Sequence, residues 1–520
     1  MNDILFAENL KRLDLLKASR TKENTISVAI YRNHSFELVA GVLNSFLSFS
    51  KMNADFKYSD YDDSFNFQFQ EADLQIIWVD ANRYKTSEVA SFLEERVSIL
   101  RSYTKSPILL VYVSDKELAL SPNITDFVCI SVNQLLSDMG TALYDYAKEP
   151  YSGTSLSDKA CLQLARYLGM RYIPAIFKTP FKAVVVDLDN TLYRGILGED
   201  GVDNLVPNNQ LQEQLKSLKQ QGIMLCIASK NEEDDVKNLF LSRKDFVLNW
   251  SDFTTVQINW NSKAENLLKI AKTLNIGTDA MLFLDDNLAE IENVSVTNVA
   301  SILVADNICQ VLKYYPRLLK LSSSQEDNLR SKDIQANAER IELAKKLSPK
   351  EYFKKLGIKL EYCINNEYQI PRIAELLGKT NQFILGYKRY KETDVLDFMK
   401  NPKSCIITIH MSDNLSDSGI IGIFVAHNEK DELFVDELTV SCRALGRNLE
   451  NVMLPYLFIL AQRKLNTSKN TQILYKTGER NKPALSWLTQ LVGYGLQQEG
   501  FAQYQIPDDV DLSGLEVNIC

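Results

Sequence analysis

Strand-like and helical hydrophobic patterns alternate through the N-terminal third of the chain. Continuous apolar runs at residues 25–31, 74–79 and 108–113 predict buried strands. Between them, residues 36–49 and 86–103 carry apolar side chains at helical spacing and predict amphipathic helices. This alternation is typical of a layered α/β domain, and the absence of any repeat of 20–50 residues excludes solenoids and propellers.

Breaks in composition predict the domain boundaries. A connection marked by Pro174 and Pro180 precedes the next apolar strand at 183–186, and the Ser-rich stretch 322–327 precedes a highly charged helix. Beyond that helix, strands alternate with helices again, as in an α/β or α+β domain. We predict an N-terminal α/β domain at 1–175, a second α/β domain at 176–321, a charged helical linker at 322–349 and a third domain at 350–520.

Composition and charge exclude several classes of protein. The 520 residues carry 58 Lys+Arg against 67 Asp+Glu, a net charge of −9, without the basic stripe that a nucleic-acid-binding protein needs. No apolar run is long enough to span a membrane, and the N-terminus does not resemble a signal peptide. The 8 scattered cysteines fit a reducing cytoplasm and not a disulfide framework or a zinc site, and only 3 histidines are present. We therefore expect a cytoplasmic protein whose chemistry depends on carboxylates, Lys, Ser or Cys.

The most informative motif is a pair of acidic residues at the end of a predicted strand. Asp187 and Asp189 follow the apolar run 183–186, and the carboxyl ends of parallel strands are where open α/β sheets bind ligands. Neighbouring carboxylates repel each other unless a cation lies between them, and Mg²⁺ prefers oxygen ligands. The alternative is a simple turn at the end of the strand, since Asp and Asn are common in turns.

Three further motifs follow in the second domain. Ser229 ends an apolar strand, Lys263 opens a predicted helix, and the pair Asp285 and Asp286 ends another strand. Together with Asp187, these residues resemble, in type and order, the four motifs of the haloacid dehalogenase superfamily.

The resemblance implies aspartate-based phosphoryl transfer with Mg²⁺. Asp187 would be the nucleophile and Asp189 the general acid/base, while Ser229 and Lys263 would bind the transferring phosphoryl group. Mg²⁺ would be held by Asp187, the backbone carbonyl of Asp189 and one acid of the pair Asp285 and Asp286. The sequence does not decide which of these two acids contacts the metal. The adjoining motif residues predicted to bind substrate are Asn190, Thr191, Lys230 and Asn231. The intervals from Asp189 to Ser229 and from Ser229 to Lys263 are 40 and 34 residues, too short for an inserted cap domain.

Longer motifs resemble the FkbH-like family. Residues 187–201 read DLDNTLYRGILGEDG, close to the family signature DxDNTLWGG followed by GEDG, and 228–231 (ASKN) and 258–263 (INWNSK) also fit. The resemblance covers about 160–500 and implies a capless phosphatase domain between an SGNH-like α/β domain and a GNAT-like acyltransferase domain. No Ser/Asp/His set is evident in the first domain, where His34 fits a structural role. The family is associated with removing phosphate from 1,3-bisphosphoglycerate and loading glyceryl onto an acyl carrier protein in secondary-metabolite or polyketide biosynthesis.

Two positions depart from the family pattern. The usual Trp-Gly-Gly is Tyr193-Arg194-Gly195, which we expect to alter the rim of the pocket. Many glyceryl-loading members carry a cysteine where this chain has Leu188.

A glycine-containing turn in the third domain resembles the acyl-CoA-binding turn of GNAT acyltransferases. Backbone N–H groups at a helix N-terminus bind phosphate, and arginines add charge-assisted hydrogen bonds, so the phosphopantetheine arm of a carrier protein fits here. Cys442, beside this turn, is either a nucleophile with a lowered pKa or a buried small residue. The residues predicted to bind the acyl donor or the arm are Asn381, Gln382, Arg443, Gly446 and Arg447.

Three functions remain open from the sequence. The first is removal of phosphate from a phosphorylated small-molecule acyl donor, coupled to transfer of the acyl group onto an acyl carrier protein. The second is a plain capless phosphatase with a substrate-recognition module, and the third is a non-enzymatic scaffold that binds carrier proteins. The complete set of phosphoryl-transfer residues argues against the third. No nucleic acid or membrane partner is expected.

Overall fold

The chain divides into two compact units: Met1–Pro180 with Ala305–Leu321, and Phe181–Val304 with Ser322–Cys520. The computed structural model describes residues 2–520 except 18–22, 62–67, 85–87, 121–123, 322–332, 334–335, 337–339, 341–342, 344–345, 381, 442–443, 446–448 and 479–480. Most of the predicted linker helix therefore lies outside the described residues. Among the residues described, no helix is both long and apolar enough to cross a lipid bilayer.

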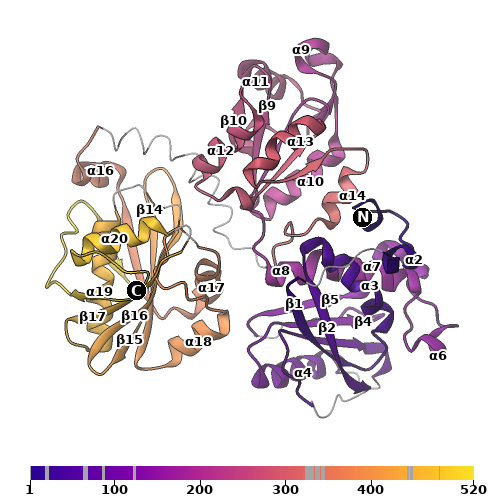
Figure 1. Ribbon diagram of the computed structural model, residues 1–520, viewed down its shortest axis with the longest axis horizontal. Helices are drawn as coiled ribbons and strands as arrows, with labels where there is room; N and C mark the ends of the chain where they lie inside the picture. Colours follow the sequence, from indigo (N-terminus) through magenta and orange to yellow (C-terminus); the bar gives the residue numbers. More distant parts are fainter. Residues whose placement is uncertain are drawn as a thin grey trace. The chain divides into compact units, whose positions relative to one another are not determined.

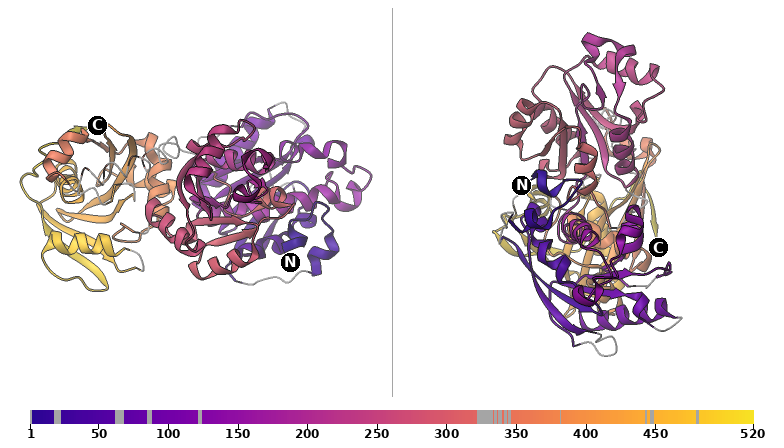
Figure 2. Two further views of the ribbon diagram at one scale, coloured as in Figure 1. Left: turned by 90° about the horizontal axis from the view of Figure 1, so that it is seen from above. Right: turned by 90° about the vertical axis from the view of Figure 1, so that its right-hand side faces the viewer.

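The first unit is a parallel sheet covered on both faces by helices (Figures 1 and 2). Its strand order, β2-β1-β3-β4-β5, is one of the common doubly wound arrangements. Apolar side chains alternate along β1, so that Val28 and Ile30 pack with α3 and α7 while Ala29 and Tyr31 face the helix α4. The bounds are β1 Thr25–Arg32, β2 Asn53–Tyr61, β3 Leu74–Asp80, β4 Ile108–Val113, β5 Phe127–Ser131, α3 Glu37–Leu47, α4 Val89–Tyr103 and α7 Asp158–Tyr167. The strands predicted at 25–31, 74–79 and 108–113 are confirmed.

His34 in this unit is fully buried, with its ring stacked on Trp78 at 4.3 Å between centroids. Its Nδ1 lies 3.0 Å from the hydroxyl of Thr154. Burial, and then the charge of Arg83, lower the pKa of His34 well below its usual value. The imidazole is therefore neutral and packed, in agreement with the structural role expected for it.

The helix α14 (Ile308–Tyr314) is part of the first unit, although the sequence break at 322 suggested that it belongs to the second predicted domain. Tyr314 is buried in the core of the first unit, and the guanidinium of Arg166 lies 3.7 Å from the centre of its ring. Arg171 donates a hydrogen bond to the carbonyl of Lys313 at 2.6 Å. The chain thus leaves this unit at Pro180 and returns to it at Ala305.

The five-stranded sheet of residues 181–304 is parallel throughout, in the order β10-β9-β6-β11-β12. Helices α12 and α13 pack on one face, where Cys226 and Ala228 of β9 contribute to the core. Helix α10 contacts β9 from the face to which Leu225 and Ile227 point. The bounds are β6 Ala183–Val186, β9 Met224–Ser229, β10 Phe253–Ile258, β11 Met281–Asp285, β12 Ala300–Leu303, α10 Asn209–Gln220, α11 Glu233–Ser242, α12 Lys263–Leu274 and α13 Leu288–Val294.

The C-terminal part is an α+β fold around a mostly antiparallel seven-stranded sheet, in the order β18-β17-β16-β15-β14-β13-β19. Helix α19 packs on one face and helices α17 and α18 on the other. The bounds are β13 Lys359–Ile364, β14 Ser404–Ser412, β15 Asp417–Glu429, β16 Glu432–Val440, β17 Asn470–Lys476, β18 Glu499–Gln505, β19 Glu516–Ile519, α17 Ile370–Lys379, α18 Glu392–Lys400, α19 Glu450–Leu465 and α20 Lys482–Val492.

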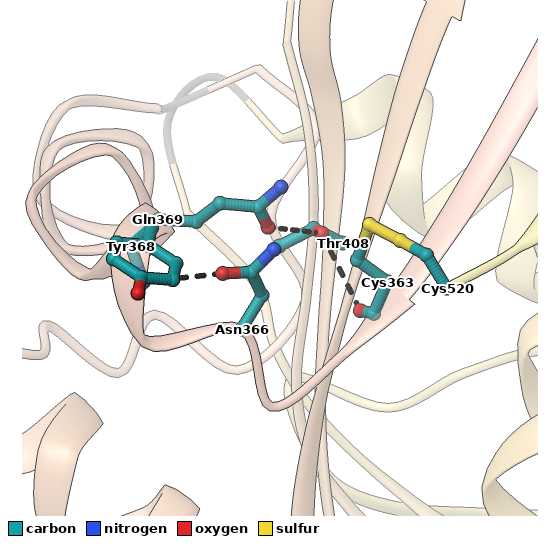
Figure 3. The surroundings of a disulfide bond; sticks show 6 residues. All are labelled: Cys363, Asn366, Tyr368, Gln369, Thr408 and Cys520. Carbon is teal, nitrogen blue, oxygen red and sulfur yellow. Dashed lines mark hydrogen bonds between the residues drawn. A yellow bond between two sulfur atoms is a disulfide. The ribbon is translucent and has the colours of Figure 1, made fainter.

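A disulfide joins Cys363 and Cys520, which corrects the expectation from the scattered cysteines (Figure 3). The two residues are 157 positions apart, so their spacing gives no indication that they are paired. They meet because β19 adds in parallel to β13, with Ile519 beside Tyr362, which brings the two Cα atoms to 4.6 Å. Thr408, on the neighbouring strand, donates to the carbonyl of Cys363 at 3.4 Å.

Candidate active site

Strand order brings the motif residues of the second domain to one edge of the sheet. β6 lies between β9 and β11, so the carboxyl ends of the three strands, with Asp187, Ser229 and Asp285, are adjacent. Lys263 begins α12, whose N-cap is Ser262, and its side chain is only 3% exposed. The four residues predicted from separate motifs therefore form one buried group.

Lys263 is the cation at the centre of this group. Its Nζ lies 2.5 Å from Oδ1 of Asp187 and 3.1 Å from Oδ2 of Asp285, and it donates to the carbonyl of Ala228 at 2.7 Å. One lysine thus faces two buried carboxylates, with Asp286 close by. The group carries an excess of negative charge.

Asp187, Asp285 and Asp286 form a possible metal site. One carboxylate oxygen of each lies within 4.8 Å of those of the other two. Burial raises the pKa of all three carboxyls, and in Asp187 and Asp285 the charge of Lys263 opposes the rise. Oδ2 of Asp285 is buried, and its charged partner is Lys263, whose Nζ also pairs with Asp187. Three clustered carboxylates that share one lysine are hard oxygen donors with an excess of negative charge, which is what a divalent cation such as Mg²⁺ requires, so these residues fit the ion.

The carboxyl group of Asp189 accepts hydrogen bonds from three directions. Its Oδ1 accepts the hydroxyl of Tyr193 at 2.7 Å and the backbone N–H of Leu197 at 3.0 Å. Its Oδ2 accepts the amide of Asn231 at 2.9 Å, and the same amide donates to the hydroxyl of Ser229 at 3.1 Å. Asn231, predicted to bind substrate, thus links the motif of β9 to that of β6.

Of the tripeptide expected to alter the rim of the pocket, Arg194 is exposed but Tyr193 is buried. Its side chain is 0% exposed and packs against Phe246, with ring centroids 5.9 Å apart. Burial, and then the charge of Asp189, raise the pKa of the Tyr193 hydroxyl far above its usual value, so it remains a donor.

Two of the other three predicted substrate-binding residues of this domain, Asn190 and Lys230, have protein partners of their own. Asn190 adopts φ +54° and closes the turn, because its side-chain oxygen accepts the N–H of Gly195 at 3.0 Å. Lys230 pairs with Glu290 at 2.5 Å. Thr191 is fully buried, and its hydroxyl has no hydrogen-bond partner among the residues described.

In the C-terminal part, Gln382 lies beside Phe383 at a cavity that is also lined by Leu445, Glu450 and Trp487. The other residues predicted for this domain lie outside the described residues, so the structure does not place them: Asn381, Cys442, Arg443, Gly446 and Arg447.

A buried acid that the sequence did not single out holds the chain beside this cavity. Glu437 of β16 accepts backbone N–H groups from Leu385, Gly386 and Lys388 at 2.8–2.9 Å and from Leu438 at 3.0 Å. Burial raises its pKa to about 7, although the four N–H groups oppose the rise. A single glutamate in a strand forms no motif, so only the three-dimensional structure identifies this role.

One family model matches part of the chain. Residues 203–313 match the family described as acid phosphatase, and this segment contains Ser229, Lys263, Asp285 and Asp286, while Asp187 lies before it. Together with the buried group at the edge of the sheet, the match supports a phosphatase domain of the haloacid dehalogenase type. No curated protein matches the chain.

Three solved structures are similar to parts of the chain. The N-terminal part of a Bacteroides fragilis protein, containing a phosphatase domain and complexed with Mg, is 21% identical over 62% of this chain and 99% of its own, with a TM-score of 0.48. The 3-deoxy-D-manno-octulosonate 8-phosphate phosphatase of Moraxella catarrhalis, with magnesium, phosphate and KDO, is 21% identical over 25% of this chain and 70% of its own (TM-score 0.20). The ribosomal-protein-S18-alanine N-acetyltransferase of Escherichia coli is 10% identical over 29% of this chain and 97% of its own (TM-score 0.21).

Proposed function

We propose that the chain is a Mg²⁺-dependent phosphatase that removes phosphate from a phosphorylated small-molecule acyl donor and passes the acyl group to an acyl carrier protein. The observation that carries the phosphatase proposal is the buried group of Asp187, Lys263 and Asp285 at the carboxyl edge of a parallel sheet. Mg²⁺ would be held by Asp187, the backbone carbonyl of Asp189 and the pair Asp285 and Asp286. When bound, the ion would offset the negative charge of the phosphoryl oxygens.

In the proposed reaction, an oxygen of Asp187 attacks the phosphorus of the donor's phosphate ester and the bond from phosphorus to the ester oxygen breaks, which gives an aspartyl-phosphate. Asp189 gives its proton to the ester oxygen, which leaves as a hydroxyl group. Lys263 and Ser229 bind the oxygens of the transferring group and stabilise their charge. A water molecule then attacks phosphorus, its proton passes to Asp189, and the bond to Asp187 breaks to release phosphate.

The acyl-transfer half of the proposal rests on the resemblance of the sequence of residues 443–448 to an acyl-CoA-binding turn. A cavity in the C-terminal part adds support, because Gln382 and Phe383 supply polar and apolar surface beside residues of α19 and α20. A three-carbon acyl phosphate similar to 1,3-bisphosphoglycerate, which also carries a phosphate ester, is the proposed donor. The phosphatase site cleaves the ester and leaves the acyl phosphate intact. A thiol then attacks the acyl carbon, the bond from that carbon to the phosphate oxygen breaks, and phosphate leaves as the thioester forms.

The phosphatase proposal is tested by replacing the nucleophile. Asp187→Asn should lower Mg²⁺-dependent release of phosphate from p-nitrophenyl phosphate by several orders of magnitude, since a carboxamide cannot form the acyl-phosphate bond. Asp234→Asn is the matched control, because Asp234 belongs to the same part of the chain and its side chain is 94% exposed. Equal activity of the Asp187 variant and the control would refute the assignment.

Acyl transfer needs a separate assay. The chain is incubated with Mg²⁺, 1,3-bisphosphoglycerate and a phosphopantetheinylated acyl carrier protein, and the carrier is weighed by intact mass spectrometry. A glyceryl thioester on the carrier supports the proposal. Phosphate release without any change in the carrier's mass would leave the plain phosphatase as the function.

A further inference from the structure

A tyrosine behind the active-site carboxylates contacts the residue proposed as general acid/base. The hydroxyl of Tyr193 donates to Asp189 at 2.7 Å, from a side chain that solvent does not reach. Tyr193 lies too deep to touch a substrate, so any effect on the reaction must pass through Asp189.

The position of the tyrosine is fixed by its backbone as well as its ring. Tyr193 lies in β7 (Tyr193–Arg194), which pairs with β8 (Val206–Pro207), and its backbone also forms a bridge to Asp189. Gly195 follows β7 directly and adopts φ +111°, a backbone conformation that favours glycine. A Cβ added there would lie 2.9 Å from a side-chain carbon of Leu205, so only glycine fits. The donor oxygen therefore has little freedom to move.

Asp189 needs such a constraint because its surroundings are negative. The charges of Asp187 and Asp189 both raise the pKa of Asp286, so the three carboxyl groups lie in one negative region. The negative charges of Asp187 and Asp286 repel the Asp189 carboxylate from the side of Asp187, where the phosphoryl group would be bound. The donors from Tyr193, Leu197 and Asn231 hold it there; the first two follow Asp189 in the same segment, and the third follows β9.

We propose that Tyr193 is a positioning residue: its hydroxyl fixes the carboxyl group of Asp189 where that group exchanges a proton with the attacking water. The inference rests on the proposed phosphatase function. In the hydrolytic step the proton moves from water to Asp189 as the oxygen–phosphorus bond forms, and Tyr193 neither gains nor loses a proton.

The test is a double-mutant cycle on the full-length chain with p-nitrophenyl phosphate and Mg²⁺. Tyr193→Phe keeps the buried ring and removes only the donor, so kcat should fall by about tenfold or more while KM changes by less than about twofold. Asp189→Asn should lower kcat further. In the Asp189→Asn background, Tyr193→Phe should have no additional effect, because the group through which it acts is gone.

Each outcome distinguishes a Tyr193 that positions Asp189 through its hydroxyl from a Tyr193 that only packs as a buried ring. If Tyr193→Phe retains wild-type kcat, or lowers kcat by the same factor with and without Asp189, the proposal is wrong. If Tyr193→Phe fails to fold, 4-aminophenylalanine at position 193 replaces it, since this residue keeps the ring and a donor. Wild-type kcat with 4-aminophenylalanine, and loss of kcat with the donor-free 4-methylphenylalanine, would support positioning, whereas equal kcat for the two would overturn it.

Asp187→Asn, measured in the same assay, separates the two proposals. An inactive Asp187→Asn protein together with a fully active Tyr193→Phe protein overturns the role of Tyr193 and leaves the phosphatase function intact. An active Asp187→Asn protein overturns the phosphatase function and, with it, the role of Tyr193.

Discussion

Replacing Glu437 by glutamine should change how the stability of the C-terminal part depends on pH. The carboxyl is fully buried, and its pKa is raised from 4.5 to about 7. A carboxyl whose pKa is raised on folding stabilises the fold below pH 4.5, and this contribution is lost as the pH rises through 7. Between pH 5.5 and pH 8 the loss amounts to about 2 kcal/mol, at 1.36 kcal/mol per pKa unit.

Glutamine does not titrate, so the variant should lack this pH dependence. It should also be less stable at pH 5.5, because one N–H group, most simply that of Lys388, then faces the NH₂ of the amide. A buried donor without an acceptor costs about 1–3 kcal/mol. The difference in stability between wild type and variant should therefore shrink by about 2 kcal/mol between pH 5.5 and pH 8.

Hydrogen exchange followed by mass spectrometry suits this measurement, because a chain with several domains does not unfold in one step. The peptide to follow contains the amides of Leu385, Gly386 and Lys388, which bond directly to Glu437. The matched control is Glu361→Gln, at an exposed position of the same sheet. A difference between wild type and the Glu437 variant that is the same at both pH values would refute the reasoning.

Four further predictions concern the active site and the disulfide. Lys263→Met should lower kcat for p-nitrophenyl phosphate at least a hundredfold, as about 2.7 kcal/mol of charge stabilisation is lost; a value within threefold of wild type would contradict the role of Lys263. Excess EDTA should abolish phosphate release and added Mg²⁺ should restore it, as a colorimetric phosphate assay will show; activity that survives EDTA would count against the metal site. Cys442→Ser should keep phosphate release but lose carrier loading, as judged by intact mass; loading at the wild-type rate would show that Cys442 is not the nucleophile. Cys363→Ala with Cys520→Ala should lower the thermal unfolding temperature of the C-terminal part, because a disulfide typically contributes about 2–4 kcal/mol; an unchanged temperature would mean that strand pairing alone holds β19.

The sequence predicted the residues of the candidate phosphatase site but not the contacts between them. Asp187, Ser229, Lys263 and Asp285 each stand at the end of a strand or the start of a helix, and parallel pairing is enough to bring such positions together. The burial of Tyr193 depends instead on a short pairing of β7 with β8, which the sequence pattern does not indicate. The contact of Tyr193 with Asp189 therefore emerged only from the structure.

Strands inside the sheets were predicted more successfully than strands at their edges. β3, β4 and β6 are buried along their whole length and read as continuous apolar runs. The edge strands β2, β18 and β19 have exposed positions and polar residues, so their sequences are similar to those of loops. The same difficulty concealed the disulfide, because it depends on the pairing of β19 with β13.

The return of α14 to the first unit constrains the order in which the protein matures on the ribosome. Tyr314 completes the core of the first unit, yet the ribosome reaches it only after translating Phe181–Val304. At about 5–20 residues per second, that delay is on the order of ten seconds. During this time the surface that α14 will cover is open to solvent, while the sheet that carries Asp187 is synthesised in full. Nascent first units should therefore be captured by a chaperone that binds apolar surface, and released once residues 305–321 emerge.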